Sequence, residues 1–302
     1  MLSLDGGGAK GFYTLGVLRE VEALTQRPLC EVFDLIYGTS TGSIIAALLG
    51  LGLSVDTIYD LYRRHVVEVM QAKKAAQKSA ALNALANKVF GDRGFADFRT
   101  GVGIVTTKWQ VETPMIFKST AAQGHGRQAT FVPGFGCRIA DAVQASCSAF
   151  PFFEKMIVTT SAGDRVELVD GGYCANNPTL YAIADATAAL GFPPEQLRVL
   201  SVGVGVYPAP KPAFVMGLAK KYLLSLQLLQ KTLEINTASM EQLRAVLFKN
   251  VPSVRVSEAF TQPEMATDMF EHNLNKLNLL RQRGAESFAR HEGEIRELLG
   301  CP

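Results

Sequence analysis

The sequence lacks the features that would place it across a membrane, on a secretory route or on a nucleic acid polymer. Its longest apolar stretch, residues 44–53, is roughly half of the ~20 residues that a membrane-spanning helix needs. No basic segment followed by an apolar run and a small-residue cleavage site stands at the N-terminus, so we expect a cytoplasmic protein. Lys and Arg number 30 against 28 Asp and Glu, a net charge of +2, which argues against binding of DNA or RNA polymers through an overall field.

Motifs for metals and redox chemistry are also missing. The 5 cysteines are widely spaced, and no two of them form a C-x-x-C pair. This spacing argues against a zinc site and a disulfide framework, and it fits a reducing compartment. The phosphate-binding pattern G-x-x-x-x-G-K-[ST] does not occur either. We therefore expect the protein to work without a metal and without a cofactor.

The apolar pattern predicts strands that alternate with helices along most of the chain. Predicted strands cover residues 2–4, 32–37, 103–107, 115–117, 166–169 and 199–206, and predicted helices cover 15–24, 44–49, 55–90, 139–147 and 179–190. Such alternation is typical of an α/β fold whose mainly parallel central sheet is covered on both faces. Long helices are predicted for 214–248 and 265–299. We expect one domain over 1–302, with a core over 1–206 and a mainly helical C-terminal part over 207–302.

Three glycine-rich motifs each follow a predicted strand. Gly38-Thr39-Ser40-Thr41-Gly42 has the pattern of a nucleophile elbow, although a turn that merely caps a helix gives the same pattern. Asp5-Gly6-Gly7-Gly8 is a loop whose backbone N–H groups can approach an anion closely. Asp170-Gly171-Gly172 ends a third strand, and in isolation it would be a simple turn. Because the carboxyl ends of parallel strands share one sheet edge, we expect all three motifs to open on one crevice.

In this order, D-G-G-G-x-K-G at 5–11, G-T-S-T-G at 38–42 and D-G-G at 170–172 resemble the motifs of the patatin-like phospholipase family. The resemblance covers about residues 1–206 and includes the segment 138–151 and Asn-Asn-Pro at 176–178. It implies a three-layer α/β/α patatin-like fold with a helical C-terminal extension. It also implies a phospholipase A type lipid acyl hydrolase with Ser40 as nucleophile and Asp170 as base. The remaining site residues that it implies are the oxyanion-hole glycines Gly6, Gly7 and Gly8 and the motif-supporting Lys10, Gly38, Gly42, Gly171 and Gly172.

A narrower likeness is to patatin-like effectors of bacterial antiphage systems, which cyclic oligonucleotides switch on. This likeness implies a cyclic oligonucleotide activator and a membrane phospholipid substrate, reached by peripheral contact at the inner face of the membrane. The Leu-rich face of residues 214–231 is typical of a core or subunit contact, so a homo-oligomer is a further expectation. Lys10 stands where the family more often has Arg, and Lys lacks the planar fork that would position the loop firmly.

Two rival functions remain open at the level of sequence. Ser40 and Asp170 with His272 or His291 follow the chain order of a Ser-Asp-His esterase, although too few strands precede Ser40 for that fold. The second rival is a catalytically silent patatin-like module that senses a nucleotide or a lipid.

The segment from Arg63 to Arg93 is a candidate for membrane contact. It contains seven basic residues, among them Lys73, Lys74 and Lys78, but only two acidic residues. We interpret it as a lid or docking helix on an anionic membrane, or alternatively as a solvated Ala-rich helix packed on the sheet.

Overall fold

The computed structural model describes residues 1–125, 129–210 and 218–301, and for residues 218–223 it describes the backbone alone. Within these residues eight strands form one sheet in the order β5-β6-β3-β2-β1-β7-β8, with β4 paired to β3. Pairing is parallel among β1, β2, β3, β7 and β8 and antiparallel at β4, β5 and β6, so the predicted mainly parallel sheet is confirmed. The strands are β1 (Leu2–Leu4), β2 (Leu35–Thr39), β3 (Gly101–Lys108), β4 (Thr113–Lys118), β5 (Met156–Thr159), β6 (Arg165–Asp170), β7 (Val199–Val202) and β8 (Ser253–Val256).

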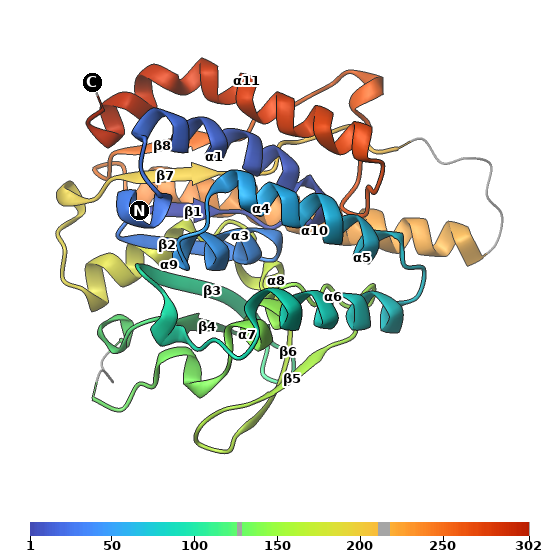
Figure 1. Cartoon of the computed structure of the whole chain (residues 1–302), viewed down its shortest axis with the longest axis horizontal. Coiled ribbons are helices and arrows are strands. Elements are labelled where there is room, and N and C mark those ends of the chain that lie inside the picture. Colours follow the sequence, from blue (N-terminus) through green and yellow to red (C-terminus); the bar gives the residue numbers. More distant parts are fainter. Residues whose placement is uncertain (126–128, 211–217, 302) are drawn as a thin grey trace.

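Helices cover both faces of this sheet, which confirms the three-layer α/β/α arrangement (Figure 1). Successive strand residues point to opposite faces, so Ile36 joins one apolar core while Leu35 and Tyr37 join the other. The first core includes side chains of α1 (Gly11–Thr25), α3 (Thr41–Gly50), α6 (Ala75–Phe90), α7 (Ile139–Ser146) and α11 (Leu274–Leu299). The second includes side chains of α8 (Gly172–Ala175) and α9 (Thr179–Ala184), on which α10 (Leu218–Leu247) packs.

The C-terminal part is built into the sheet. Residues 253–256 form β8, which extends the sheet beyond β7 with Arg255 opposite Ser201. α11 runs alongside α1 (Figure 1), and the two helices approach so closely that a Cβ on Gly16 would lie 2.0 Å from the Arg281 carbonyl oxygen. The mainly helical C-terminal part therefore also contributes an edge strand.

Several element bounds differ from the predicted ones. The helix predicted from residue 265 begins at Leu274, because the Asn273 side chain accepts the N–H groups of the first turn and caps the helix there. The strand predicted for 199–206 ends at Val202, and neither β5 nor β8 was predicted. The predicted Leu-rich stretch 214–231 lies partly outside the described residues. None of the described helices is both long and apolar enough to cross a membrane.

The shorter helices α2 (Leu29–Val32), α4 (Val55–Leu61) and α5 (Val67–Gln71) connect the larger elements. α4 and α5, with the π-helical turn at residues 62–66 between them, lead from α3 towards α6. This connection forms one wall of the site described next.

Candidate active site

Ser40 occupies a strained turn between β2 and α3. Its φ of 53° and ψ of −124° are a conformation that non-glycine residues rarely adopt. Glycine is required on both sides, because a Cβ on Gly38 would lie 2.2 Å from the Gly42 carbonyl oxygen and one on Gly42 would lie 2.3 Å from that of Leu4. The Ser40 amide donates a hydrogen bond of 2.9 Å to the Ser146 hydroxyl. These features are those of a nucleophile elbow rather than of an ordinary helix cap.

Asp170 ends β6 and is almost fully buried. Its Oδ1 accepts the Gly172 amide at 2.7 Å, whereas its Oδ2 is buried with no hydrogen-bond partner among the described residues. Burial raises the pKa of this carboxyl from 3.8 to about 7, and the Gly172 amide and the Ser40 hydroxyl oppose that rise. The turn needs glycine at position 171, since a Cβ on Gly171 would lie 2.1 Å from the Val105 carbonyl oxygen. A carboxyl that titrates near neutral pH beside a serine hydroxyl has the properties of a general base.

The direction of β6, which places Asp170 beside Ser40, differs from the parallel strand that was predicted. β6 runs antiparallel to β3, with Asp170 opposite Thr106, while Thr39 of β2 pairs with Val105 of the same strand. β6 therefore overlaps only the carboxyl-terminal end of β3 and stops level with the end of β2. The motifs do lie at one edge of the sheet, but for Asp170 the cause is a short antiparallel overlap rather than a parallel strand end.

The glycine loop after β1 lies against the nucleophile. A Cβ on Gly6 would lie 3.1 Å from the Cβ of Ser40, and Gly8 has a φ of +59°. The Gly6 amide donates to the Asn176 carbonyl at 3.0 Å, so this donor is engaged in the structure. Among the described residues, the Gly7 and Gly8 amides donate no hydrogen bond. Of the three glycines predicted to hold an oxyanion, these two therefore have donors that no described residue occupies.

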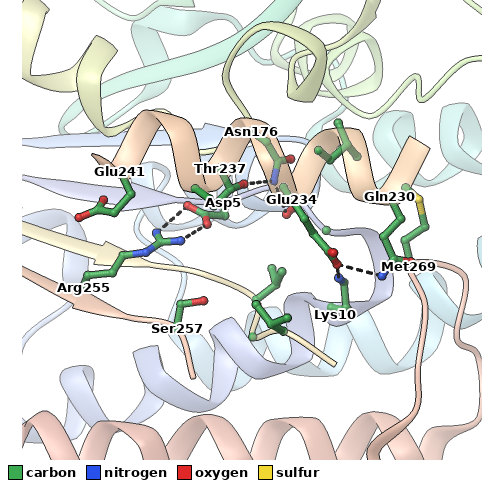
Figure 2. A pocket seen from close by; sticks show the side chains of 17 residues that line it. Asp5, Lys10, Asn176, Gln230, Glu234, Thr237, Glu241, Arg255, Ser257 and Met269 are labelled. Atoms are coloured by element: carbon green, nitrogen blue, oxygen red, sulfur yellow. Dashed lines mark hydrogen bonds and ion pairs between the residues drawn. The ribbon is translucent and has the colours of Figure 1, made fainter. Parts of the chain in front are cut away.

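Lys10 holds this loop to α10. Its side chain is 3% exposed, and Nζ lies 3.4 Å from Oε1 of Glu234 (Figure 2). Burial lowers the pKa of the Lys10 amine, and the Glu234 carboxylate counteracts that effect. Asn176, also drawn in Figure 2, donates from Nδ2 to Thr237 of α10 and to the Gly6 carbonyl. Lys10 therefore supports the loop through an ion pair with a helix that follows it by more than two hundred residues.

Sequence reasoning did not assign roles to Ser146 or Asn176. Both lie in segments that carry the family resemblance, 138–151 and 176–178, and this resemblance was the only indication in the sequence that they have a role at the site. Their partners in the sheet, the loop and α10 are far away in the chain, so no local pattern could reveal the contacts.

Two small apolar cavities continue from Ser40 between α3 and α6. The first, about 30 Å³, touches Ser40 and Gly8, and the second is about 20 Å³. Both are lined by Ile44, Val66, Leu82 and Leu85. Cavities of this size hold only a few water molecules, so a larger apolar group can enter only if these side chains move apart.

The basic segment does not present all of its lysines to solvent. α6 buries residues 78, 82, 86 and 90, one per turn, and Lys78 is 3% exposed. The Lys78 Nζ lies 4.0 Å from the ring centroid of Phe270, and burial lowers its pKa while Asp268 raises it. The inclusion of Lys78 in a docking surface is therefore wrong, and Lys73 and Lys74 remain exposed.

The histidines considered for a Ser-Asp-His triad have other neighbours. The His272 Nδ1 lies 3.2 Å from the Phe270 carbonyl oxygen, and the His291 ring nitrogens lie 3.3 Å from Glu258 and Glu294. Among the hydrogen bonds of the described residues, none joins a histidine to Ser40 or Asp170. The arrangement around Ser40 accordingly consists of a serine, a carboxyl and backbone amides.

Comparison with known proteins gives consistent matches. Residues 2–183 match the family model described as patatin-like phospholipase. A cUMP-AMP-activated phospholipase of Escherichia coli is 61% identical over 299 residues, which are 99% of this chain and 93% of that protein. A cGAMP-activated phospholipase of Pseudomonas aeruginosa is 25% identical over 67% of this chain and 61% of its own length. The calcium-independent phospholipase A2-gamma of Oryctolagus cuniculus is 27% identical over 68% of this chain and 28% of its own length.

Proposed function

Because the chain belongs to the patatin-like phospholipase family, we propose that it hydrolyses acyl esters of membrane phospholipids with Ser40 and Asp170 as its catalytic dyad. The resemblance inferred from the motifs is confirmed by the family match, and an acyl hydrolase is the activity of this family. The observation that carries the dyad is the buried Asp170 carboxyl, with a pKa of about 7, next to a serine in a strained elbow.

The proposed reaction proceeds through an acyl-enzyme. Ser40 Oγ attacks the ester carbonyl carbon while its proton passes to Asp170, and the amides of Gly7 and Gly8 stabilise the resulting oxyanion. Asp170 then protonates the oxygen of the leaving lysophospholipid as the ester C–O bond breaks. Water, deprotonated by Asp170, attacks the acyl carbonyl, and the fatty acid leaves as the Ser40 hydroxyl regains its proton. The apolar cavities beside Ser40 are the proposed place for the acyl chain.

Substitution of the dyad tests this assignment. We expect Ser40→Ala and Asp170→Asn each to abolish release of fatty acid from phospholipid vesicles, and the double variant to be no worse than either, because the two groups act as one unit. The melting temperature of each variant checks that the fold is intact. If Asp170→Asn kept near-normal turnover while His272→Ala or His291→Ala lost it, a triad would replace the dyad.

We also propose that a cyclic dinucleotide switches this activity on. The support is the 61% identity over nearly the full chain to a phospholipase described as cUMP-AMP-activated, and the more distant similarity to a cGAMP-activated one. Fatty acid release with and without cyclic UMP–AMP measures the effect directly. The role in antiphage defence and the contact with the inner face of the membrane stay predictions that follow from this proposal.

A further inference from the structure

We propose that the cavity between α10 and the loop after β1 is the binding site of the cyclic dinucleotide, an inference that rests on the activation proposed above. The cavity has a volume of about 310 Å³, within the range of sites for small molecules. Ser40 is not among the residues that line it. Its walls come from the ends of β1 and β7, from β8 and from α10 (Figure 2).

The cavity lies where ligands bind in open α/β sheets. From β1 the chain continues to β2 on one side of the sheet, whereas from β7 it continues to β8 on the other side. The strand order therefore reverses between β1 and β7, and the crevice outside their carboxyl ends is the expected binding place. Asp5, Gly6 and Gly7 after β1 and Val204 and Gly205 after β7 line the cavity at this point.

Lys10 and Arg255 are the cations in the walls, one for each phosphodiester of a cyclic dinucleotide, and three acids, Asp5, Glu234 and Glu241, line the same cavity. Lys10 is buried and pairs with Glu234, while Arg255 pairs with Asp5. Three hydrogen bonds of Arg255 are found among the described residues, two to Asp5 and one to Ser201. Two of its five N–H groups therefore stay available to a phosphodiester. Glu234 is 35% exposed, so it is the acid that a second phosphodiester can displace, and the anion then binds Lys10 in its place.

The remaining lining suits nucleobases. Gln230, Thr237 and Ser257 provide hydrogen-bond donors and acceptors, and Val204, Leu233 and Met269 provide apolar contact. Asn176 also lines the cavity, but its buried Oδ1, for which no partner is found among the described residues, packs against Gly6 and Gly172 on the side of Ser40.

The same contacts connect the cavity to the reaction. Lys10 follows the glycine loop directly, and Asn176 binds Gly6, which lies against Ser40. A ligand that replaces Glu234 at Lys10 separates the loop from α10 and lets the Gly7 and Gly8 amides adjust to the oxyanion. The ion pair between Lys10 and Glu234 thus favours the inactive state in the absence of ligand.

A blocking variant tests the location. Ala238 lines the cavity from the exposed side of α10, so we expect Ala238→Trp to weaken binding of cyclic UMP–AMP at least thirtyfold by isothermal titration calorimetry, and to abolish activation. Ser239→Trp, at the next exposed position, is the matched control and should bind and respond like the parent. Parent-like nucleotide binding by Ala238→Trp would overturn the assignment. If it kept nucleotide binding and lost only phospholipid hydrolysis, the cavity would be a lipid headgroup site instead.

A second variant tests the displacement at Lys10. We expect Glu234→Gln to bind cyclic UMP–AMP about tenfold more tightly and to show raised fatty acid release without nucleotide, because the competing carboxylate is gone. Glu292→Gln, which removes an ion pair with Arg296 on α11, is the control. Unchanged or weaker nucleotide binding by Glu234→Gln would show that the ion pair is structural only.

If the parent hydrolysed phospholipid but bound neither cyclic UMP–AMP nor cyclic GMP–AMP, the activation proposal itself would fail, whatever the variants do.

Discussion

Burial of one carboxyl, that of Asp170, sets the pH range of the proposed reaction. The group must be deprotonated to accept the Ser40 proton, and its pKa is raised to about 7 by burial. We therefore expect kcat/KM for a water-soluble ester to rise about tenfold per pH unit below pH 7 and to level off above it. A pH profile between about 5 and 9 measures this. A profile that is flat through pH 7 would mean that Asp170 is not the base.

An added Cβ would meet a side chain at Gly7 but a backbone carbonyl at Gly8. Substitutions at these two positions can therefore distinguish an effect on catalysis from an effect on folding. At Gly7 the φ of 168° lies outside the left-handed region, and an added Cβ would lie 2.6 Å from the Val204 side chain. At Gly8 the φ is +59° and the Cβ would lie 2.3 Å from the Met269 carbonyl oxygen, which no side-chain change relieves.

We expect Gly7→Ala to lower kcat about a hundredfold, because displacing an oxyanion donor costs about 3 kcal/mol, and Val204→Ala to restore most of the loss in the double variant. Steady-state kinetics on a water-soluble ester give the result. Gly8→Ala with Val204→Ala is the control and should not recover. If Gly7→Ala turned over normally while remaining folded, the amide of Gly7 would have no part in the oxyanion hole.

At the scale of elements, local sequence patterns predicted the strands, turns and helices that form from neighbouring residues, but not the contacts between distant segments. The strand, turn and helix around Ser40 follow from a short apolar run, two glycines and a second apolar run, and the structure has them. The residues of β6 do not indicate whether the strand runs parallel or antiparallel to β3. Its overlap with β3 depends on where β3 ends, which the residues of β6 do not indicate either. Lys78 was misjudged because charge predicts exposure, whereas its place one turn before Leu82 on the inner face of α6 puts it against Phe270. The residues that join α10 to the site could not be predicted because every partner is distant in sequence.

α6 forms the outer wall of the apolar cavities, so its inward residues should govern the length of acyl chain accepted. Leu85 lines both cavities, and overpacking it costs about 1–3 kcal/mol. We expect Leu85→Trp to lower kcat/KM for a long-chain phospholipid about tenfold or more and to leave hydrolysis of a butyrate ester nearly unchanged. Ala84→Phe, at an exposed position on the same helix, should alter neither substrate. Equal losses on both esters would place the acyl chain elsewhere.

At the scale of the whole molecule, a nearly neutral protein must reach an anionic surface through a local patch. The net charge is +2, so any attraction to lipid comes from where the cations lie. Lys73 and Lys74 stand between α5 and α6, exposed, and a few residues after Val69 and Met70 of the cavity beside Ser40. A membrane held at this point would bring lipid to the mouth of the proposed acyl site.

Near an anionic membrane each lysine contributes about 1 kcal/mol, so we expect Lys73→Gln with Lys74→Gln to weaken binding to anionic vesicles about thirtyfold. The loss should shrink as salt screens the surface, and binding to neutral vesicles should not change. Co-sedimentation with vesicles of both compositions, at low and high salt, gives the measurement.

Lys231→Gln with Lys249→Gln removes the same charge from exposed positions on and just after α10 and is the matched control. Parent-like binding of the first double variant to anionic vesicles would show that this patch does not direct the protein to lipid. An equal loss in the control would show that net charge, rather than the position of these lysines, is what matters. Lys78→Gln is expected to leave vesicle binding unchanged, because its amine is covered by Phe270 and does not meet the membrane.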